Sequence, residues 1–388
     1  MAIGSPRSSM TDPIPFANLS AQRQRLGSRI NEAIDRVLAH GRFILGPEVA
    51  ELEQKLAAFA EAKHCVACAN GTEALSLALM AWGVGPGDAV FVPAFTFVAT
   101  AEAVAWLGAT PIFVDVRADT FNIDVDGLKA AITDASEKGL KPRAVIAVDL
   151  FGQPADYFLL NAVAERHGIS VLADAAQSFG ATLGNKRVGS LAPMTATSFF
   201  PVKPLGCYGD GGALFTESDD LAALVKSLRS HGSGKEKYDN VRIGLNSRLD
   251  TLQAAILLTK LEIFPEEIEA RQSVAERYDA LLGDIVETPV VMDTATSVWA
   301  QYTIKFERRA HIAACLKKDG ISTAVYYPLP LNRQPGYACF PSAPRGVPVS
   351  EKLANTVLSL PMHPYLDVEA QDRIVACIRR AYASPSAA

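Results

Sequence analysis

The sequence of 388 residues has few cysteines, no long apolar run and little net charge, and each of these absences excludes a class of protein. Six cysteines are too few for a disulfide framework, and they fit a reduced compartment, the cytoplasm. No stretch of about 18 apolar residues is present that could span a bilayer. The net charge of −5 provides no general attraction for nucleic acid or for an anionic membrane. Any anionic ligand must therefore be bound by a local site.

Two short segments invite a special interpretation that the sequence does not support. The start, MAIGSPRSSMTDP, lacks the apolar stretch of a secretory signal, and its small, polar composition predicts a disordered tail over residues 1–13. Cys65 and Cys68 form a single C-x-x-C pair, but a metal or redox site would need a second pair or a redox βαβ context. Small buried residues of a strand are the favoured interpretation of this pair.

From about residue 64 the sequence alternates β-rich runs with helical stretches. Several runs are continuously apolar, as expected for strands that are covered on both faces. The alternation predicts a mainly parallel α/β sheet. The predicted strands are HCVACA, AVFVP, TPIFVDV, RAVIAVDL, ISVLADA, TATSFF and GGALFT, with helices at about 72–82, 97–107, 125–135 and 156–167.

The pattern changes near residue 219, and helical segments dominate from there to about residue 283. Pro265 interrupts this helical run. We therefore expect a large domain over 14–265 and a small C-terminal α/β domain over 266–388. The small domain is predicted to contain the strand TIKF and helices near 308–319, 350–359 and 367–381.

The segment Asn70-Gly71-Thr72 lies between a predicted strand and a helix, which suits phosphate binding. Gly71 permits a tight turn, Thr72 can cap the helix, and the free N–H groups at the helix start can bind an anion. An ordinary capped helix is the alternative. Taken alone, this motif does not decide between them.

An apolar strand ends at Asp174 in VLADAAQSFGA, at the edge where α/β sheets bind their ligands. Ionisation of a carboxylate there is costly without a cation or several donors, and a protonated pyridine nitrogen would be such a cation. A helix-capping aspartate is the alternative.

In SFFPVKPLGCYGDGGALF, Lys203 follows an apolar strand and is flanked by Pro201 and Pro204. A buried lysine can become a nucleophile toward a carbonyl, although a surface lysine beside a turn is the alternative. Together the three motifs offer a phosphate site, a pyridinium carboxylate and an imine-forming lysine. These are the contributions that a protein makes to pyridoxal phosphate chemistry.

The chain resembles the DegT/DnrJ/EryC1/StrS family of sugar aminotransferases in the stretches NGTEAL, PAFTFVAT, VDVRADTFNID, DAAQSFGA, SFFPVKPLGCYGDGG, LRSHG and GLNSRLDTLQAA. The likeness covers most of residues 14–380. It implies the type I, aspartate-aminotransferase-like fold of pyridoxal-phosphate-dependent transferases, with a large, mostly parallel seven-stranded sheet and a small C-terminal α/β domain. It also implies amino transfer, usually from glutamate, to a keto sugar linked to a nucleotide, by a homodimer with shared active sites.

The resemblance assigns roles to individual residues. Lys203 would carry the cofactor as a Schiff base and shuttle a proton, Asp174 would pair with the pyridine nitrogen, and Gln177 would lie near the ring oxygen. Some related proteins have histidine in place of this lysine and act as dehydratases. The aromatic residue that stacks on the ring would be Phe97 in preference to Phe95. The phosphate would be bound by Gly71, Thr72, Ser198 and, from the partner subunit, Asn246.

The C-terminal stretches STAVYYPLPLNRQPGY and LSLPMHPYLD resemble members that act on 3-keto nucleotide sugars, and in particular enzymes that aminate UDP-2-acetamido-2-deoxy-3-oxo-glucuronate for surface polysaccharide or O-antigen synthesis. A diphosphate and a carboxylate require cations. The alternatives are a 4-keto sugar aminotransferase or a dehydratase on the same fold, or a non-catalytic regulator that binds pyridoxal phosphate. The candidate substrate contacts are Arg248, Tyr326, Arg333, His363 and Lys237.

Overall fold

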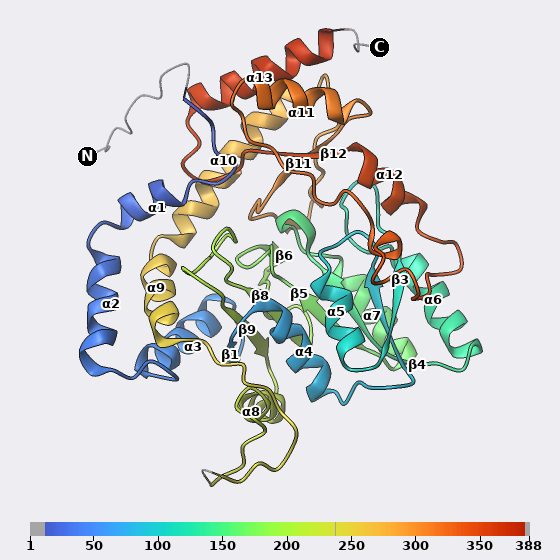
Figure 1. Cartoon of the computed structure of the whole chain (residues 1–388). Helices are drawn as coiled ribbons and strands as arrows, with labels where there is room; N and C mark the ends of the chain where they lie inside the picture. Colours follow the sequence, from blue (N-terminus) through green and yellow to red (C-terminus); the bar gives the residue numbers. More distant parts are fainter. Residues whose placement is uncertain (1–11, 237, 385–388) are drawn as a thin grey trace.

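A computed structural model describes residues 12–236 and 238–384, and a seven-stranded sheet lies at its centre (Figure 1). The strand order is β1-β9-β8-β5-β4-β2-β3. Strand β9 is antiparallel to both of its neighbours, and the other pairs are parallel. All seven predicted strands and the mainly parallel sheet are confirmed. Their bounds are β1 His64–Cys68, β2 Asp88–Pro93, β3 Thr110–Val114, β4 Lys141–Val148, β5 Ser170–Asp174, β8 Met194–Ser198 and β9 Gly212–Thr216.

Helices cover both faces of the sheet, because successive residues of each strand point to opposite sides. Val90 and Val92 of β2 join the core on one face, and Phe91 joins the core on the other. This double burial explains the continuously apolar strands. The first face is covered by α4 (Gly71–Ala81), α5 (Ala99–Trp106) and α8 (Asp219–Leu228), and the second by α3 (Pro47–Phe59), α6 (Val125–Glu137), α7 (Tyr157–His167) and α9 (Thr251–Leu261).

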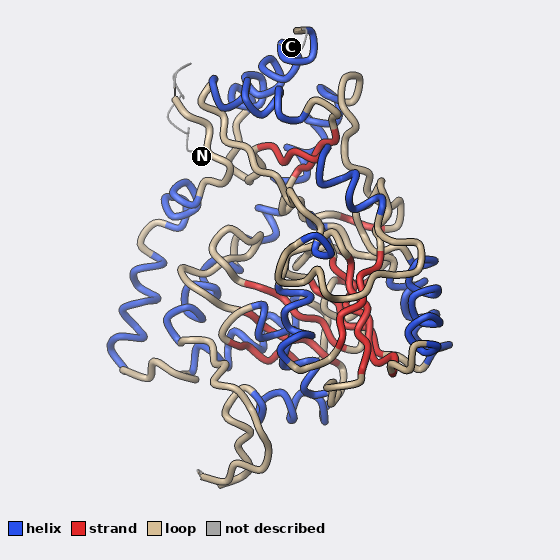
Figure 2. Tube along the Cα trace, turned by 45° about the vertical axis from the view of Figure 1, so that its right-hand side comes forward, coloured by secondary structure: helices blue, strands red, loops and turns tan. Residues whose placement is uncertain are grey.

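A separate core lies near the C-terminus, where β11 (Tyr302–Lys305) and β12 (Val357–Leu360) form an antiparallel pair covered by α11 (Arg309–Lys318) and α13 (Val368–Ala383) (Figure 2). Helix α10 (Phe264–Leu282) connects the two cores. Its first residue packs in the large core, and its later turns pack in the small one. Pro265 lies in the first turn of α10, where proline is tolerated. The expected division between residues 265 and 266 stays a prediction.

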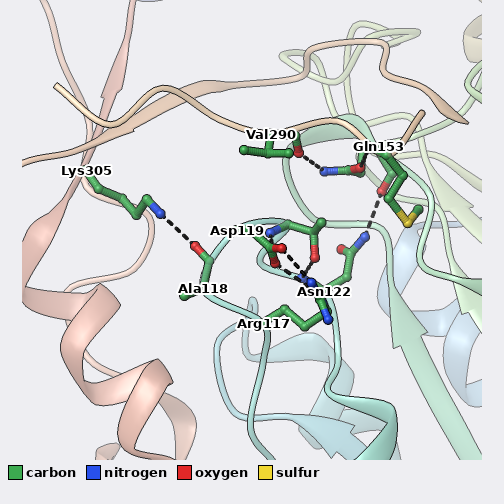
Figure 3. Close-up of polar contacts among 9 residues, drawn as sticks. Arg117, Ala118, Asp119, Asn122, Gln153, Val290 and Lys305 are labelled. Carbon is green, nitrogen blue, oxygen red and sulfur yellow. Dashed lines mark hydrogen bonds and ion pairs between the residues drawn. The ribbon is translucent and has the colours of Figure 1, made fainter. Parts of the chain in front are cut away.

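Hydrogen bonds also join the two parts of the chain beside the sheet (Figure 3). The ammonium group of Lys305 in β11 donates to the carbonyl oxygen of Ala118 at 2.8 Å, and Gln153 Nε2 donates to the carbonyl oxygen of Val290, also at 2.8 Å. Asn122 Nδ2 donates to the carbonyl oxygen of Pro154 at 2.9 Å. The loops that follow β3 and β4 are therefore fixed against each other and against the C-terminal part.

The structure corrects the predicted secondary structure in three places. The helix expected at 350–359 is α12 (Pro348–Thr356), and the residues after it form β12 because they are buried and pair with β11. Residues 229–236 and 238–250, within the expected helical stretch, form a loop that extends away from the sheet (Figure 1). The predicted layout lacks the N-terminal helices, which include α1 (Leu19–Leu26) and α2 (Arg29–His40) as well as α3.

The smaller elements complete the described chain. Strands β6 (Thr182–Leu183), β7 (Lys186–Arg187) and β10 (Ala295–Thr296) form a short sheet, and η1 (Leu150–Gly152) and η2 (Leu331–Arg333) are single turns. No helix in the described part of the chain is long and apolar enough to cross a membrane. Of the predicted N-terminal tail, residues 1–11 lie outside the described residues.

The C-x-x-C pair lies in strand β1, where both cysteines are buried free thiols, as the favoured interpretation holds. Burial raises the pKa of the Cys68 thiol to about 12. A thiol with such a pKa is neutral at physiological pH, so it behaves as a small apolar residue of the core.

Candidate active site

The site forms where the carboxyl ends of β1, β2, β5 and β8 meet at one edge of the sheet. Strand β1 points the same way as β8, because both are antiparallel to β9 between them. Strands β2, β5 and β8 are linked by parallel pairings through β4. The segments that follow Cys68, Pro93, Asp174 and Ser198 therefore converge, as expected for a ligand site in an α/β sheet.

Gly71 and Ser198 lie in direct contact at this edge. A Cβ atom on Gly71 would lie 2.6 Å from Cβ of Ser198, and one on Gly212 would lie 2.5 Å from the carbonyl of Asn70. Glycine is thus required at both positions because the neighbouring residues pack directly against the backbone. This reason differs from the tight turn that we expected at Gly71. The start of α4 and the hydroxyl of Ser198 form one surface.

Asn70, and not Thr72 as expected, caps helix α4. Its Oδ1 accepts a hydrogen bond from the backbone N–H of Glu73 at 2.8 Å. The N–H groups of Gly71 and Thr72, at the first two positions of the helix, have no partner within the helix. They are available to an anion beside Ser198, and the partial positive charge of the helix start favours that anion.

Asp174 ends β5 and is 7% exposed. Its Oδ2 accepts a hydrogen bond from Thr100 Oγ1, and its Oδ1 accepts one from the backbone N–H of Ala176, each at 3.2 Å. Burial raises the pKa of Asp174, and these two donors and the ammonium group of Lys203 only partly oppose the shift. A cationic ligand group beside this carboxyl would complete its charge balance.

Lys203 lies on a rigid turn that follows β8. Its backbone N–H donates to the carbonyl oxygen of Phe200 at 2.8 Å. A Cβ atom on Gly206 would lie 2.5 Å from the carbonyl oxygen of Pro201, so only glycine allows the turn to close. From α9, Lys260 Nζ donates to the carbonyl oxygen of Gly206 at 2.6 Å. Lys260, which is 1% exposed, is a supporting residue that sequence reasoning missed.

Lys203 and Asp174 are electrostatically coupled across the site. Burial lowers the pKa of Lys203, and the carboxylate of Asp174 opposes that shift. Conversely, the ammonium group of Lys203 lowers the pKa of Asp174. The structure therefore brings these two predicted residues into one site. A lysine with a lowered pKa has a larger fraction of neutral amine, which is the nucleophilic form.

Of the two candidate stacking residues, Phe97 has an open ring and Phe95 does not. Phe97 is 55% exposed, whereas Phe95 is fully buried. Both rings adjoin Tyr327, with centroid distances of 6.4 Å for Phe97 and 6.1 Å for Phe95. Of these two rings, only that of Phe97 has a face open to a planar ligand, and its stacking on the cofactor stays a prediction.

Gln177 is buried and its amide is anchored by the protein. Its Oε1 accepts a hydrogen bond from the backbone N–H of Phe151 at 2.7 Å, and its Nε2 approaches the hydroxyl of Tyr327 at 3.4 Å. Tyr327 was not among the predicted residues, although its neighbour Tyr326 was. The ring of Tyr326 instead packs edge-on against Phe16 at 6.0 Å.

The predicted substrate residues occupy different environments. Arg333 is 61% exposed in its side chain and forms an ion pair with Glu351 at 2.7 Å. Its turn, η2, is tied to the end of β2, because the backbone N–H of Leu331 donates to the carbonyl oxygen of Ala94 at 2.8 Å. Arg333 thus lies on a turn that is bonded to the residue after β2. Lys237 lies outside the described residues.

His363 is 4% exposed and lines a small cavity together with Lys203 and Arg271. Among the described residues, neither ring nitrogen of His363 has a hydrogen-bond partner, and Nε of Arg271 also has none. Burial, with a smaller effect of Arg271, lowers the pKa of His363 to about 4, so the imidazole is neutral. The cavity therefore adjoins the Lys203 turn and is lined by polar atoms that lack protein partners.

Asn246 and Arg248 lie in the loop between α8 and α9. The side chain of Asn246 is exposed, and its backbone forms a bridge with Ser230. Ser247 Oγ accepts a hydrogen bond from the backbone N–H of Ala69 at 3.4 Å, which holds this loop beside the end of β1. Nε of Arg248 is buried without a partner within the described residues.

The residues present fit pyridoxal 5′-phosphate. Gly71, Thr72 and Ser198 offer phosphate donors, and Asp174 is a buried carboxyl that calls for a cation such as a protonated pyridine nitrogen. Phe97 offers an open aromatic face. Lys203 offers a primary amine whose neighbour across the site is Asp174. Each chemical group of the cofactor thus has a matching group in the protein.

Comparisons with known proteins agree with this chemistry. A model of the DegT/DnrJ/EryC1/StrS aminotransferase family matches residues 24–379. The UDP-2-acetamido-2-deoxy-3-oxo-D-glucuronate aminotransferase of Pseudomonas aeruginosa is 51% identical over 366 residues, which cover 94% of this chain and 99% of that protein. A crystal structure of an aminotransferase of this group from Brucella abortus is 50% identical, with a TM-score of 0.94, and covers 96% of this chain and all of that one. NtdA from Bacillus subtilis, solved with bound cofactor PMP, is 29% identical, with a TM-score of 0.85, and covers 97% of this chain and 86% of that one.

Proposed function

This chain belongs to the DegT/DnrJ/EryC1/StrS aminotransferase family and uses pyridoxal 5′-phosphate, and we propose that it aminates the 3-keto group of a UDP-linked N-acetyl-hexosamine or of its uronic acid. The observation that carries the aminotransferase function is that Asp174 ends β5 and Lys203 lies on the turn after the neighbouring parallel strand β8, within one site. The likeness to the Pseudomonas aeruginosa enzyme over nearly the whole of both chains supports the substrate.

Lys203 and Asp174 have complementary parts in this proposal. When bound, pyridoxal phosphate supplies an electron sink for the cleavage of the Cα–H bond of the amino donor. Asp174 keeps the pyridine nitrogen protonated, since its buried carboxylate is stabilised by that positive charge. Nζ of Lys203, as a free amine, takes the proton from Cα and returns it during amino transfer, as general base and then general acid.

The remaining cofactor contacts divide between binding and orientation. Gly71, Thr72 and Ser198 bind the phosphate at the start of α4, where N–H groups and helix dipole act together. Phe97 stacks on the ring and thereby holds it against Asp174. Gln177, anchored through Phe151, orients the ring oxygen.

The substrate requires cations that the net charge of the chain does not provide. Arg333 beside the end of β2 and Arg248 beside the end of β1 are the proposed partners of the diphosphate and the carboxylate. The buried His363 lines a cavity beside the Lys203 turn, its ring nitrogens have no partner among the described residues, and it is a proposed contact of neutral polar groups. Tyr326 stays a prediction as a further substrate contact.

We also propose that glutamate is the amino donor and that the protein acts as a homodimer. Apolar side chains exposed in two loops support dimer formation: Phe43 and Ile44 are 45% and 46% exposed, and Val241 and Ile243 are 52% and 90% exposed. The second loop also carries Asn246, the residue expected to reach the phosphate in the partner subunit. The cytoplasmic location stays a prediction.

The test is amination of purified UDP-linked 3-keto and 4-keto sugars with glutamate as donor, followed by mass spectrometry of the products. We expect the amino sugar from the 3-keto substrate and 2-oxoglutarate as co-product. Amination of the 4-keto sugar alone would contradict the proposed position, and loss of the sugar hydroxyl without nitrogen incorporation would indicate dehydration instead. A Lys203→Ala variant, which should yield neither product, is the control for catalysis by another protein.

A further inference from the structure

A second buried carboxyl, Asp149, lies behind Asp174, that is, one strand further along the sheet from Lys203. Asp149 follows β4 and is fully buried. Strands β4 and β5 are parallel neighbours, and the backbone N–H of Asp149 donates to the carbonyl oxygen of Asp174 at 3.1 Å. The mechanism above makes no use of Asp149, although burial of an unpaired carboxylate is costly.

Three donors satisfy the carboxylate of Asp149. Ser178 Oγ donates to Oδ2 at 2.6 Å, while the hydroxyl of Tyr157 and the backbone N–H of Ala155 donate to Oδ1 at 2.7 and 2.8 Å. The backbone N–H of Ala155 can only donate, which requires an acceptor at Oδ1. This arrangement matches an ionised carboxylate with donors on both oxygens.

The bond to Ser178 fixes the turn that carries two cofactor residues. Asp174 opens this turn, Gln177 lies within it, and Ser178 closes it, with its backbone N–H bonded to the carbonyl oxygen of Ala175 at 3.2 Å. On the other side, the backbone N–H of Leu150, the residue after Asp149, donates to Asn122 Oδ1 at 3.2 Å. Asp149 therefore ties the turn to a rigid part of the large domain.

We propose that Asp149 is a positioning residue of the cofactor site, which fixes the turn 174–178 through Ser178 and adds a second negative charge behind Asp174 that favours the protonated pyridine nitrogen. This inference rests on the proposed contact between Asp174 and that nitrogen. Tyr157 and Asp174 are the titratable groups that face Asp149. A like charge close to Asp174 is unfavourable on its own and would become favourable with a cation bound at Asp174.

Asp149→Asn tests the charge, because asparagine keeps the size of the side chain and an acceptor for Ala155 and Tyr157. Burial raises the pKa of Asp149 to about 7, although its three hydrogen-bond donors lower it. The carboxylate of the wild type is therefore charged at pH 8.5 and neutral at pH 5.5. We expect the dissociation constant of pyridoxal phosphate, measured by fluorescence after dialysis, to be roughly tenfold higher in the variant at pH 8.5. At pH 5.5 the ratio of the two dissociation constants, variant to wild type, should fall toward one.

Asp156→Asn is the matched control, since Asp156 lies in the same loop and caps α7 through the backbone N–H of Leu159 at 3.0 Å. The ratio of its dissociation constant to that of the wild type should stay near one at both pH values. A ratio for Asp149→Asn that is near one at pH 8.5, or that does not change with pH, would overturn the inference. If that variant does not fold, Ser178→Ala removes the tether alone, and an unchanged affinity at pH 8.5 would equally overturn it.

Asp174→Asn separates this inference from the proposed function. It should weaken binding of pyridoxal phosphate at both pH values and by a larger factor than Asp149→Asn. Wild-type affinity of Asp174→Asn would refute the proposed contact with the pyridine nitrogen, and the inference about Asp149 would fall with it. If Asp174→Asn binds pyridoxal phosphate clearly more weakly and the effect of Asp149→Asn does not change with pH, the inference about Asp149 is refuted and the proposed function is not.

Discussion

The hydroxyl of Thr100 donates a hydrogen bond to Oδ2 of Asp174 at 3.2 Å and lies 3.3 Å from the hydroxyl of Thr96. Both threonines are almost fully buried, so this short chain of hydroxyls is part of the interior of the site. It lowers the pKa of Asp174 against the effect of burial. Thr100 therefore favours the ionised carboxylate that the cofactor requires.

Removal of this hydroxyl should weaken cofactor binding. A hydrogen bond to a charged group contributes about 1.5–3 kcal/mol, so Thr100→Val should bind pyridoxal phosphate roughly tenfold or more weakly. Equilibrium dialysis of the apoenzyme measures the affinity. Thr133→Val is a matched control, because Thr133 donates to the carbonyl oxygen of Lys129 on the exposed surface of α6. Equal affinity of both variants would show that Thr100 does not act on Asp174.

Lys203 should be the site of covalent attachment of the cofactor. After reduction with borohydride, the wild-type protein should gain the mass of one pyridoxyl phosphate group, and Lys203→Ala should gain none and lose all detectable turnover. Lys226→Ala, a change in α8, should be labelled like the wild type. Labelling of Lys203→Ala at another lysine would assign the chemistry to that residue.

The exposed ring of Phe97 should contribute to cofactor affinity. Stacking of an aromatic side chain on a planar ligand is worth about 1 kcal/mol, so Phe97→Ala should raise the dissociation constant of pyridoxal phosphate by roughly fivefold. Phe158→Ala removes a ring that is 63% exposed on α7 and should leave the affinity unchanged. A loss of affinity in the Phe158 variant alone would exclude the assignment of Phe97.

The buried Lys260 predicts a rise of stability with pH. Burial lowers its pKa to about 8 in the folded chain, from 10.5, so between pH 8 and 10.5 the unfolded chain binds more protons than the folded one. The free energy of unfolding must therefore gain up to about 3 kcal/mol from this group as the pH rises across that window. Below pH 8 the group is charged in both states and the gain is absent.

Lys260→Met should lack this gain. Urea unfolding of wild type and variant at pH 8 and pH 10 isolates the contribution of Lys260, because other groups cancel in the difference. Lys226→Met, in the surface helix α8, should follow the wild type at both pH values. An equal pH dependence in wild type and Lys260→Met would show that Lys260 keeps its usual pKa when folded.

Several site residues are readable from the sequence because each is marked by its immediate neighbours. Asp174 ends an apolar run, and Lys203 is flanked by Pro201 and Pro204 after another. Strand ends of a parallel sheet meet at one edge, so these positions converge whatever the details of packing.

Other residues carry no such local mark. Thr100 and Asp174 are 74 positions apart, and Gln177 and Tyr327 are 150 positions apart, so neither pair is visible in any window of the sequence. The choice of Tyr326 over Tyr327 could not be made from the sequence, because neighbouring tyrosines have the same chemistry until the backbone sets their directions. The expected cap Thr72 was wrong for a similar reason, because asparagine and threonine both cap helices and only the backbone decides where α4 begins.

The sequence by itself determined the seven strands of the large sheet, the acid at the end of one strand and the lysine on a turn after another, because hydrophobic periodicity and proline act over a few residues. Only the tertiary structure decided that Gly71 contacts Ser198, that the ring of Phe97 is exposed while that of Phe95 is buried, and that Asp149 lies behind Asp174. The reason is physical. Burial and the hydrogen bonds of a buried polar group depend on segments that are distant along the chain and meet only when the sheet and its helices have packed.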